Sequence, residues 1–270
     1  MRNATIILNR NLPDVTDRLV KQLSQDNTQV FVVEAGSDEN KLSSFCTWHA
    51  NWPEAMNDGL RAARGFNYGL FKLYEEKRFD EFDAFFLVTN DTEFAIPDPV
   101  TKLSDVLTNH PKVGILSPCS ERWGEKLLLQ QEKTRYFWYI HNTALLIRRE
   151  LIQSIMPKNE LSYMNFLFDG TNFRGYGLES ELIAKAYAND WASAITTEVW
   201  AEENEKWLLT KSDLIKTESF ENNLNLYIKE GLDWMQSKFG FSSRWHMQMY
   251  TKFWYDQFFN FHPEFLKYKI

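Results

Sequence analysis

The sequence is poor in cysteine, with only Cys46 and Cys119 among 270 residues. The two positions lack the spacing of metal-ligand pairs, so a cysteine-based metal site is not expected. Two free thiols in a reducing compartment are the simplest interpretation, and it places the protein in the cytoplasm.

Long apolar runs are also missing. No stretch approaches the roughly twenty consecutive apolar residues that a membrane-spanning helix needs, so we predict no membrane span. The apolar run in the opening segment MRNATIILNRNLPD is too short for a signal peptide. We therefore expect a cytoplasmic protein and leave open a position at the inner face of the membrane.

Positive charge, repeats and linkers are scarce too. The formal net charge is −7 and the pI is about 5.4, with no basic patch, so we expect no nucleic-acid partner. There is no internal repeat, low-complexity segment or Gly/Ser linker. Aromatic residues are abundant at 16%, and some of them should line a groove or an interface. The length suits one large α/β domain, alone or with an appendage.

Short apolar runs alternate with segments of helical spacing between Ala4 and Trp200. This alternation predicts an α/β fold with a largely parallel sheet covered by helices on both faces. The predicted strands are 4–9, 29–36, 82–90, 112–119, the start of 142–155, and 191–200, and the predicted helices are 12–26, about 66–79, 98–110, the rest of 142–155, and 178–190.

Polar side chains follow several of these strands directly. Asn9 and Arg10 end the first, Glu34 ends the second, and Asn90 and Asp91 end the third. In parallel α/β sheets, ligands bind outside the carboxyl ends of the strands. The pattern therefore predicts one binding edge.

Four segments in a fixed order carry a family resemblance. They are TIILNRN; VFVVEAGSDEN; RGFNYGL followed by FLVTNDTEF; and FRGYGLESELIAKAYANDW. The set resembles the inverting GT-A glycosyltransferases, in the family-two-like group that builds bacterial surface polysaccharides. The resemblance covers roughly Thr5 to Trp200. It implies a Rossmann-like GT-A domain over 1–205, which binds a nucleotide sugar, and a helical, aromatic-rich extension over 206–270.

The resemblance also implies roles for single residues on the nucleotide side. Glu34 stands where the family reads the base, and a carboxylate can accept from a ring N–H. Arg64 and Asn67 would hold phosphate at a helix start, although Asn67 could instead be a structural cap. Asp38 contacts the ribose or caps the next turn. The implied nucleotide-binding set is Asn9, Arg10, Glu34, Asp38, Arg64, Asn67 and Asn90.

A divalent cation, Mn²⁺ or Mg²⁺, is implied by the segment TNDTE. Asp91 matches the last acid of the family's Asp-x-Asp, Thr89 replaces the first acid, and Glu93 could supply a second oxygen ligand. The alternative is an Asx turn that closes a strand. A histidine that relatives carry after the last strand is missing from TTEVWAEENEKW, where Glu198, Glu202 or Glu203 could replace it.

Glu179 is the predicted catalytic residue. It stands at the position of the family's general base, at the start of the helix LESELIAKAYAND. The alternative is an acidic helix amino terminus, which the helix dipole favours. His141, near the expected acceptor side, is interpreted as a stacked or core residue rather than a catalytic one.

The chain changes character after Lys206. Segment 212–240 has a helical pattern with Ser212 or Asp213 as its cap, and the following segment concentrates aromatic residues from Trp245 to Phe261. A helix with these aromatics needs a partner surface. The favoured partner is the protein's own domain, and a subunit contact or a peripheral membrane contact are the alternatives.

Together these features predict an enzyme that moves a sugar from a nucleotide-sugar donor to a hydroxyl of a saccharide or lipid-linked saccharide, with inversion. A nucleotidyltransferase is disfavoured because NRNLPDVTDR has no glycine-rich loop after the first strand. A non-catalytic scaffold with the same fold remains the second alternative, because the first acid and the histidine are missing.

Overall fold

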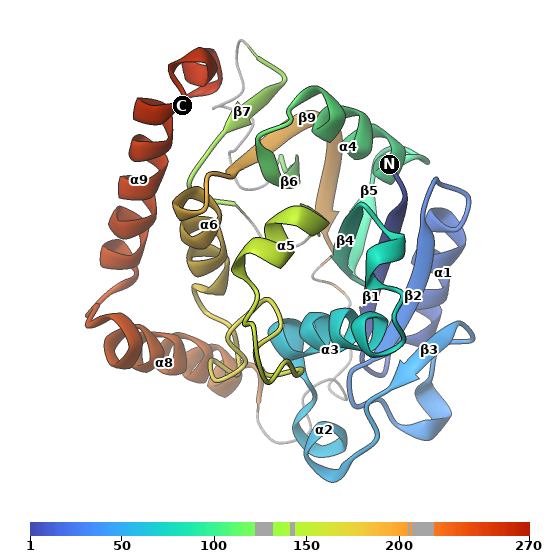
Figure 1. Cartoon of the computed structure of the whole chain (residues 1–270). Helices are drawn as coiled ribbons and strands as arrows, with labels where there is room; N and C mark the ends of the chain where they lie inside the picture. Colours follow the sequence, from blue (N-terminus) through green and yellow to red (C-terminus); the bar gives the residue numbers. More distant parts are fainter. Residues whose placement is uncertain (122–131, 141–143, 205, 207–218) are drawn as a thin grey trace.

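A computed structural model describes residues 1–121, 132–140, 144–204, 206 and 219–270. Three residues singled out in the sequence, His141, Ser212 and Asp213, lie outside this part of the chain. Figure 1 shows a twisted sheet surrounded by helices, with the last two long helices along one side.

The described strands form one nine-stranded sheet in the order β3-β2-β1-β4-β8-β6-β9-β5, with β7 also paired to β9. Strands β1, β2, β3 and β4 are mutually parallel where they pair, and so are β6 and β9. Strand β8 lies antiparallel between β4 and β6. The bounds are β1 (Asn3–Asn9), β2 (Gln29–Glu34), β3 (Cys46–His49), β4 (Ala84–Thr89), β5 (Thr92–Phe94), β6 (Val113–Cys119), β7 (Thr134–Tyr136), β8 (Ala144–Arg148) and β9 (Ala192–Glu203).

The helices confirm the predicted alternation with strands. Proline opens α1 and α4, where its fixed φ and missing N–H suit the first turn. The helices are α1 (Pro13–Leu23), α2 (Pro53–Asp58), α3 (Arg61–Glu75), α4 (Pro99–Asn109), α5 (Arg149–Ile155), α6 (Leu178–Ala188), α8 (Phe220–Phe239) and α9 (Arg244–Phe261), with short 3₁₀ turns at Glu39–Lys41, Phe79–Glu81 and Pro263–Tyr268.

Helix α3 begins at Arg61, five residues before the predicted start. No side chain caps it. Its entry is held instead by the buried Leu60, whose N–H donates to the Ala35 carbonyl at the end of β2 (3.2 Å). A start that depends on a tertiary hydrogen bond carries no local capping signal, which explains the difference.

Two glycines let α3 approach β1 closely. A Cβ on Gly65 would lie 3.0 Å from Leu8, and one on Gly69 would lie 2.8 Å from Ile6. Because the earlier glycine faces the later residue of β1, the helix runs antiparallel to the strand. The first turn of α3 therefore lies beside the carboxyl end of β1.

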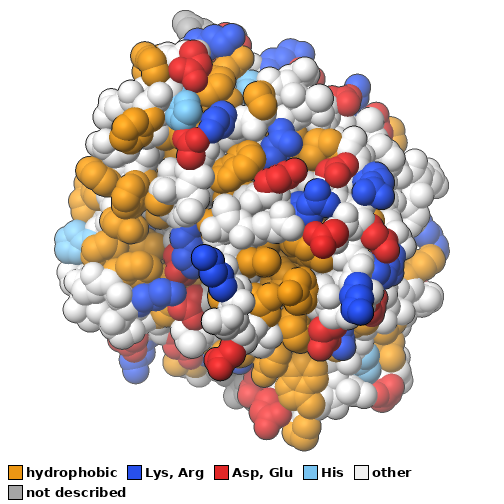
Figure 2. Space-filling model, viewed as in Figure 1, with side chains coloured by type: hydrophobic (Ala, Val, Ile, Leu, Met, Phe, Trp, Pro, Cys, Tyr) orange, Lys and Arg blue, Asp and Glu red, His pale blue; other side chains and the backbone are white. Residues whose placement is uncertain are grey.

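Helix α9 packs one face on the protein's own core, as the sequence favoured. Its buried residues belong to the same apolar cluster as the sheet, and Thr251 Oγ1 donates to the Ser180 carbonyl of α6 (3.1 Å). Its other face exposes Trp245, Phe253 and Phe261, and Figure 2 shows hydrophobic side chains gathered along this edge of the molecule. In the described segments, no helix combines the length and apolarity that spanning a membrane requires.

Candidate active site

Three of the predicted nucleotide-binding residues meet at the carboxyl ends of β2, β1 and β4. Asn9 Nδ2 donates to Glu34 Oε2 (2.8 Å), and Asn90 Nδ2 donates to Asn9 Oδ1 (3.1 Å) and to Thr16 Oγ1 (2.9 Å). All three side chains are buried. A continuous polar network therefore joins the ends of three neighbouring strands, as the sequence predicted for one edge of the sheet.

Glu34 is the centre of this network. It has no exposed surface, and it also accepts from Ser37 Oγ (2.6 Å) and from the Ser43 N–H (2.7 Å). Both carboxylate oxygens are thus engaged within the chain, where they hold the loop after β2 against the strand end. The base-reading role of Glu34 stays a prediction.

Asp91 and Glu93, the predicted metal ligands, have different surroundings. Asp91 is buried directly after Asn90. Glu93 is more exposed and accepts from Asn204 Nδ2 (2.9 Å) and Arg18 Nη2 (3.0 Å). The Asn204 hydrogen bond, together with Arg18, lowers the pKa of the Glu93 carboxyl. Glu93 is therefore held toward Arg18, and Asp91 is the buried carboxylate at the end of β4.

The three candidates for the missing histidine ligand lie on β9. Glu198 pairs with Lys133 (2.7 Å), and Glu202, opposite Glu93 in the β5–β9 ladder, accepts from Ser120 Oγ (2.9 Å). Across the described ranges, no three His, Cys, Asp or Glu side chains gather closely enough to hold a metal ion. The described residues therefore do not form a complete metal site by themselves.

Four arginines form a cationic group beside the strand ends, which we call the arginine cluster (Arg10, Arg61, Arg64 and Arg174). The guanidinium carbons of Arg64, Arg61 and Arg174 lie 4.6, 5.3 and 5.4 Å from the centre of the Phe173 ring. Burial, and next the neighbouring charge of Arg61, lower the pKa of Arg10 to about 10. Like charges crowded in this way favour a phosphate-bearing ligand.

Hydrogen bonds to backbone carbonyl groups hold two members of the cluster. Arg10 donates to the Asn57 carbonyl (2.8 Å), and Arg64 donates to the Gly170 carbonyl (2.7 Å). Arg174 forms an ion pair with Glu230 of α8. Within the described residues, Arg10 and Arg64 form no ion pair of this kind. Asp58 and Asp38 act on Arg10 from nearby and offset part of its charge.

Arg61 and Arg174 were missed in the sequence, although signals existed. Arg61 precedes Arg64 by three residues, which places both on one helix face. Arg174 lies in the same motif as Glu179.

Asp38, which the sequence placed at the ribose or in a turn cap, precedes the 3₁₀ turn at Glu39–Lys41. Its carboxylate lies 3.8 Å from Lys41 Nζ.

Asn67 lies in the second turn of α3 and ties the loop before α6 to this helix. Its Oδ1 accepts from the N–H groups of Leu167 and Phe168 (both 2.9 Å), and its Nδ2 donates to the carbonyls of Tyr163 (3.0 Å) and Phe168 (2.8 Å). The whole amide is thus used within the chain. Its phosphate-binding role stays a prediction, and its observed contacts fix the loop that leads to Glu179.

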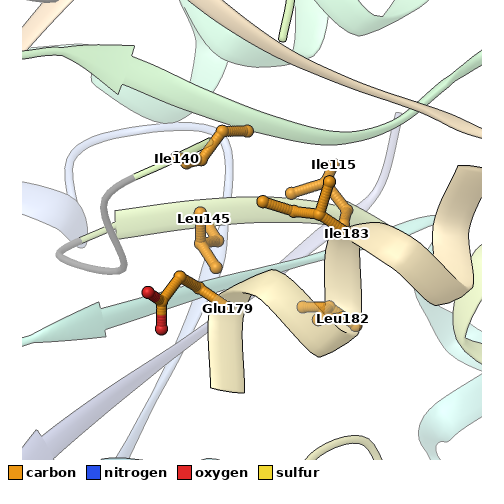
Figure 3. A pocket seen from close by; sticks show the side chains of 6 residues that line it. All are labelled: Ile115, Ile140, Leu145, Glu179, Leu182 and Ile183. Carbon is orange, nitrogen blue, oxygen red and sulfur yellow. The ribbon is translucent and has the colours of Figure 1, made fainter. Parts of the chain in front are cut away.

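Glu179 lies in the first turn of α6, after Gly175 and Gly177, which both adopt positive φ (88° and 85°). Figure 3 shows it at a narrow apolar pocket. Burial raises the pKa of the carboxyl above its ordinary value, and the charge of Arg244 opposes this rise. A carboxylate with a raised pKa is suited to accept a proton. The pocket is lined by Ile115, Ile140, Leu145, Glu179, Leu182 and Ile183.

Arg244, the first residue of α9, reaches Glu179 from the other end of the sequence. Its Nη2 donates to Glu179 Oε1 (3.2 Å) and to Tyr139 Oη (3.0 Å). No sequence pattern links two residues 65 positions apart, so sequence reasoning had no signal for this contact.

The sheet order and the helices around it define the class of fold, and comparisons with solved structures agree. No family model matches the chain, and no curated protein is similar to it in sequence. A GalNAc-T structure with UDP, GalNAc and Mn²⁺ superposes with a TM-score of 0.54 at 9% identity, over 75% of this chain and 44% of that one. Glucosyl-3-phosphoglycerate synthase from Mycobacterium tuberculosis, with Mg²⁺ and UDP, superposes with a TM-score of 0.51 at 12% identity. The match covers 90% of this chain and 80% of that one.

A mannosyltransferase from Pyrobaculum calidifontis, with GDP-Man and Mn²⁺, gives a TM-score of 0.49 at 13% identity. The match covers 54% of the mannosyltransferase and 44% of the GalNAc-T structure. The chain therefore spans about half the length of each of these two proteins. At such low identities the similarity concerns the fold. The chain has the GT-A fold, as its four motifs predicted.

Proposed function

We propose that the protein is an inverting glycosyltransferase that moves a sugar from a nucleotide-sugar donor to a hydroxyl of a saccharide acceptor, in the synthesis of a surface polysaccharide. One observation carries this proposal. The polar network at the ends of β1, β2 and β4 lies beside the arginine cluster at the start of α3, on the edge where a GT-A sheet binds its donor. The GalNAc-T structure and the glucosyl-3-phosphoglycerate synthase structure both contain UDP, which supports a donor of this class.

Glu179 is the proposed base in a direct displacement. The acceptor oxygen forms a bond to the anomeric carbon, and the bond from that carbon to the diphosphate breaks on the opposite face. The acceptor proton passes to the Glu179 carboxylate. Attack opposite to the leaving group inverts the anomeric configuration.

The leaving diphosphate is the proposed ligand of the arginine cluster. Arg61 and Arg64 carry fixed positive charge on a rigid helix, and Arg10 adds a third guanidinium. A divalent cation would be held by Asp91 together with phosphate oxygens of the donor, and when bound it supplies Lewis-acid stabilisation of the leaving group. Glu93 is the weaker candidate ligand because Arg18 and Asn204 hold its carboxylate.

Titration calorimetry with a panel of nucleoside diphosphates, with and without Mn²⁺, tests the donor side. We expect one nucleotide to bind, more tightly with Mn²⁺, and we expect Asp91→Asn to lose the gain that Mn²⁺ gives. Product analysis with the matching sugar nucleotides then tests transfer. Absence of binding by every nucleotide would contradict the proposal.

Arg64→Gln tests the arginine cluster. A hydrogen bond from a charged group contributes about 1.5–3 kcal/mol, so the affinity for the nucleoside diphosphate should fall about 10- to 100-fold. The affinity for the bare nucleoside should stay unchanged, because it lacks the phosphates. Arg78→Gln is the matched control, since Arg78 follows α3 and pairs with Glu76 and Glu81. Equal losses for nucleoside and diphosphate would instead indicate a structural effect through Gly170.

A non-catalytic scaffold is the second candidate. It is favoured by the burial of Glu179 under Arg244 and by the lack of a protein-only metal cluster in the described residues. In that case wild-type protein would neither bind a nucleotide nor form product. Nucleotide binding without product, across the donor panel, would point to a degenerate enzyme.

A further inference from the structure

We propose that Arg244 is a positioning residue for the reaction: the helix α9 supplies it to hold the Glu179 carboxylate ionised and oriented toward the acceptor. The inference depends on the proposed function only in naming Glu179 as the base. The contact itself is a property of the fold. It assigns a role in the active site to the carboxyl-terminal segment, which lies outside the four motifs.

The position of Glu179 creates the need for such a partner. Its side chain is only 9% exposed, and five apolar side chains line the pocket beside it. A buried carboxylate loses its hydration, which favours the neutral acid. A neutral acid cannot accept the acceptor's proton, so burial alone would disable this residue as a base.

Arg244 supplies the compensating charge. Within the described residues it forms the one ion pair of Glu179, at 3.2 Å. An opposite charge at this distance favours the ionised carboxylate. Only one of the two carboxylate oxygens accepts from Arg244, which leaves the other for an acceptor hydroxyl.

Two tyrosines fix the guanidinium in place. Its carbon lies 5.0 Å from the ring centre of Tyr176 and 5.3 Å from that of Tyr139, and Tyr139 Oη also accepts its hydrogen bond. Tyr227 of α8 packs edge-on against Tyr176 at 5.0 Å. The loop before α6, the segment after β7, and both carboxyl-terminal helices thus converge on one cation. Among the described residues, Arg244 and Tyr227 act on Glu179 directly, and Tyr139 and Tyr176 contact Arg244.

The place of Arg244 in its own helix supports a specific role. It is the first residue of α9, and no acidic residue accompanies it in the first turn. A positive charge at a helix amino terminus is electrostatically unfavourable. Helix stability therefore does not explain an arginine here, whereas the ion pair with Glu179 does.

The test compares Arg244→Met with Arg244→Lys in the full-length protein. Activity requires ionised Glu179, so the rate rises with pH through the pKa of that group. Removing the cation makes the carboxylate harder to ionise. In Arg244→Met, the rising limb of the pH–rate profile should therefore move to a pH about 1–3 units higher. Arg244→Lys keeps the charge and should stay nearer to wild type. Lys252→Met, which removes a positive charge from the same helix at its pair with Asp256, should not move the limb.

An NMR titration of isotope-labelled glutamate carboxyl groups gives a readout that needs no activity, with Glu179→Gln identifying the signal. The sign of the shift separates two roles. If Arg244 merely anchored α9, its loss would expose Glu179 and lower the pKa of that carboxyl toward the ordinary value. A positioning role predicts a higher pKa.

Each result decides the inference. A Glu179 signal that titrates at the same or a lower pH in Arg244→Met than in wild type would overturn it, even if wild type forms product. A raised pKa in a wild-type protein that forms no product would support the positioning role and contradict the proposed enzyme.

Discussion

Glu179→Gln is expected to slow sugar transfer about 10²–10⁴-fold, the usual contribution of a general base. The substitution keeps the shape of the side chain and an oxygen that can accept from Arg244. It removes the group that takes the acceptor's proton. Donor binding should persist, because the proposed nucleotide-binding residues lie on α3 and at or just after the ends of β1, β2 and β4. Initial rates and nucleoside diphosphate titrations on the same preparation measure both effects.

Glu181→Gln is the matched control for this substitution. Glu181 lies two residues further along α6 and is similarly buried, but its carboxylate pairs with Lys185 (2.9 Å) and Lys238 (2.8 Å). General damage from removing a buried charge would affect both variants, whereas loss of the base affects only Glu179→Gln. If Glu179→Gln transferred sugar at the wild-type rate, the assignment of the base would be wrong.

Phe258→Ala should lower the free energy of unfolding by about 3–5 kcal/mol, as expected when a large core side chain leaves a cavity. Phe258 is 2% exposed. Its ring lies 5.5 Å from Tyr187 of α6 and 6.3 Å from Tyr136 of β7, so it joins the carboxyl-terminal helix to the sheet domain. Urea unfolding followed by circular dichroism and by tryptophan fluorescence measures the change.

Phe261→Ala provides the comparison within the same helix. Phe261 is 77% exposed, and its truncation should change stability by no more than about 0.5 kcal/mol. The pair also tests the predicted division into 1–205 and 206–270. A continuous core predicts one unfolding transition for the whole chain. The extension 206–270 would be a separate folding unit if Phe258→Ala lowered the free energy of unfolding as little as Phe261→Ala does. The same would follow if Phe258→Ala unfolded only α8 and α9.

The sequence allowed much of the fold to be predicted. Apolar runs such as 4–9 and 82–90 became β1 and β4, because a buried strand needs little beyond its own composition and a neighbour on each side. The start of α3 was predicted five residues late, since its anchor is the Ala35 carbonyl on another element. The antiparallel direction of β8 also had no local signal, because strand direction depends on the path of the connection before it.

Part of the candidate site could likewise be predicted from the sequence, and part of it depends on tertiary contacts. By itself the sequence determined the strands, most helices, the acids and amides at the strand ends, and an acid at the start of α6, because each of these follows from residues that are close along the chain. Only the tertiary structure decided that Glu34 is buried with both oxygens engaged, that three arginines gather near Phe173, and that Arg244 reaches Glu179. These contacts join residues far apart along the chain, and the hydrogen bond from Arg64 to Gly170 likewise spans 106 positions. They arise from the packing of whole helices on the sheet, which no local pattern encodes.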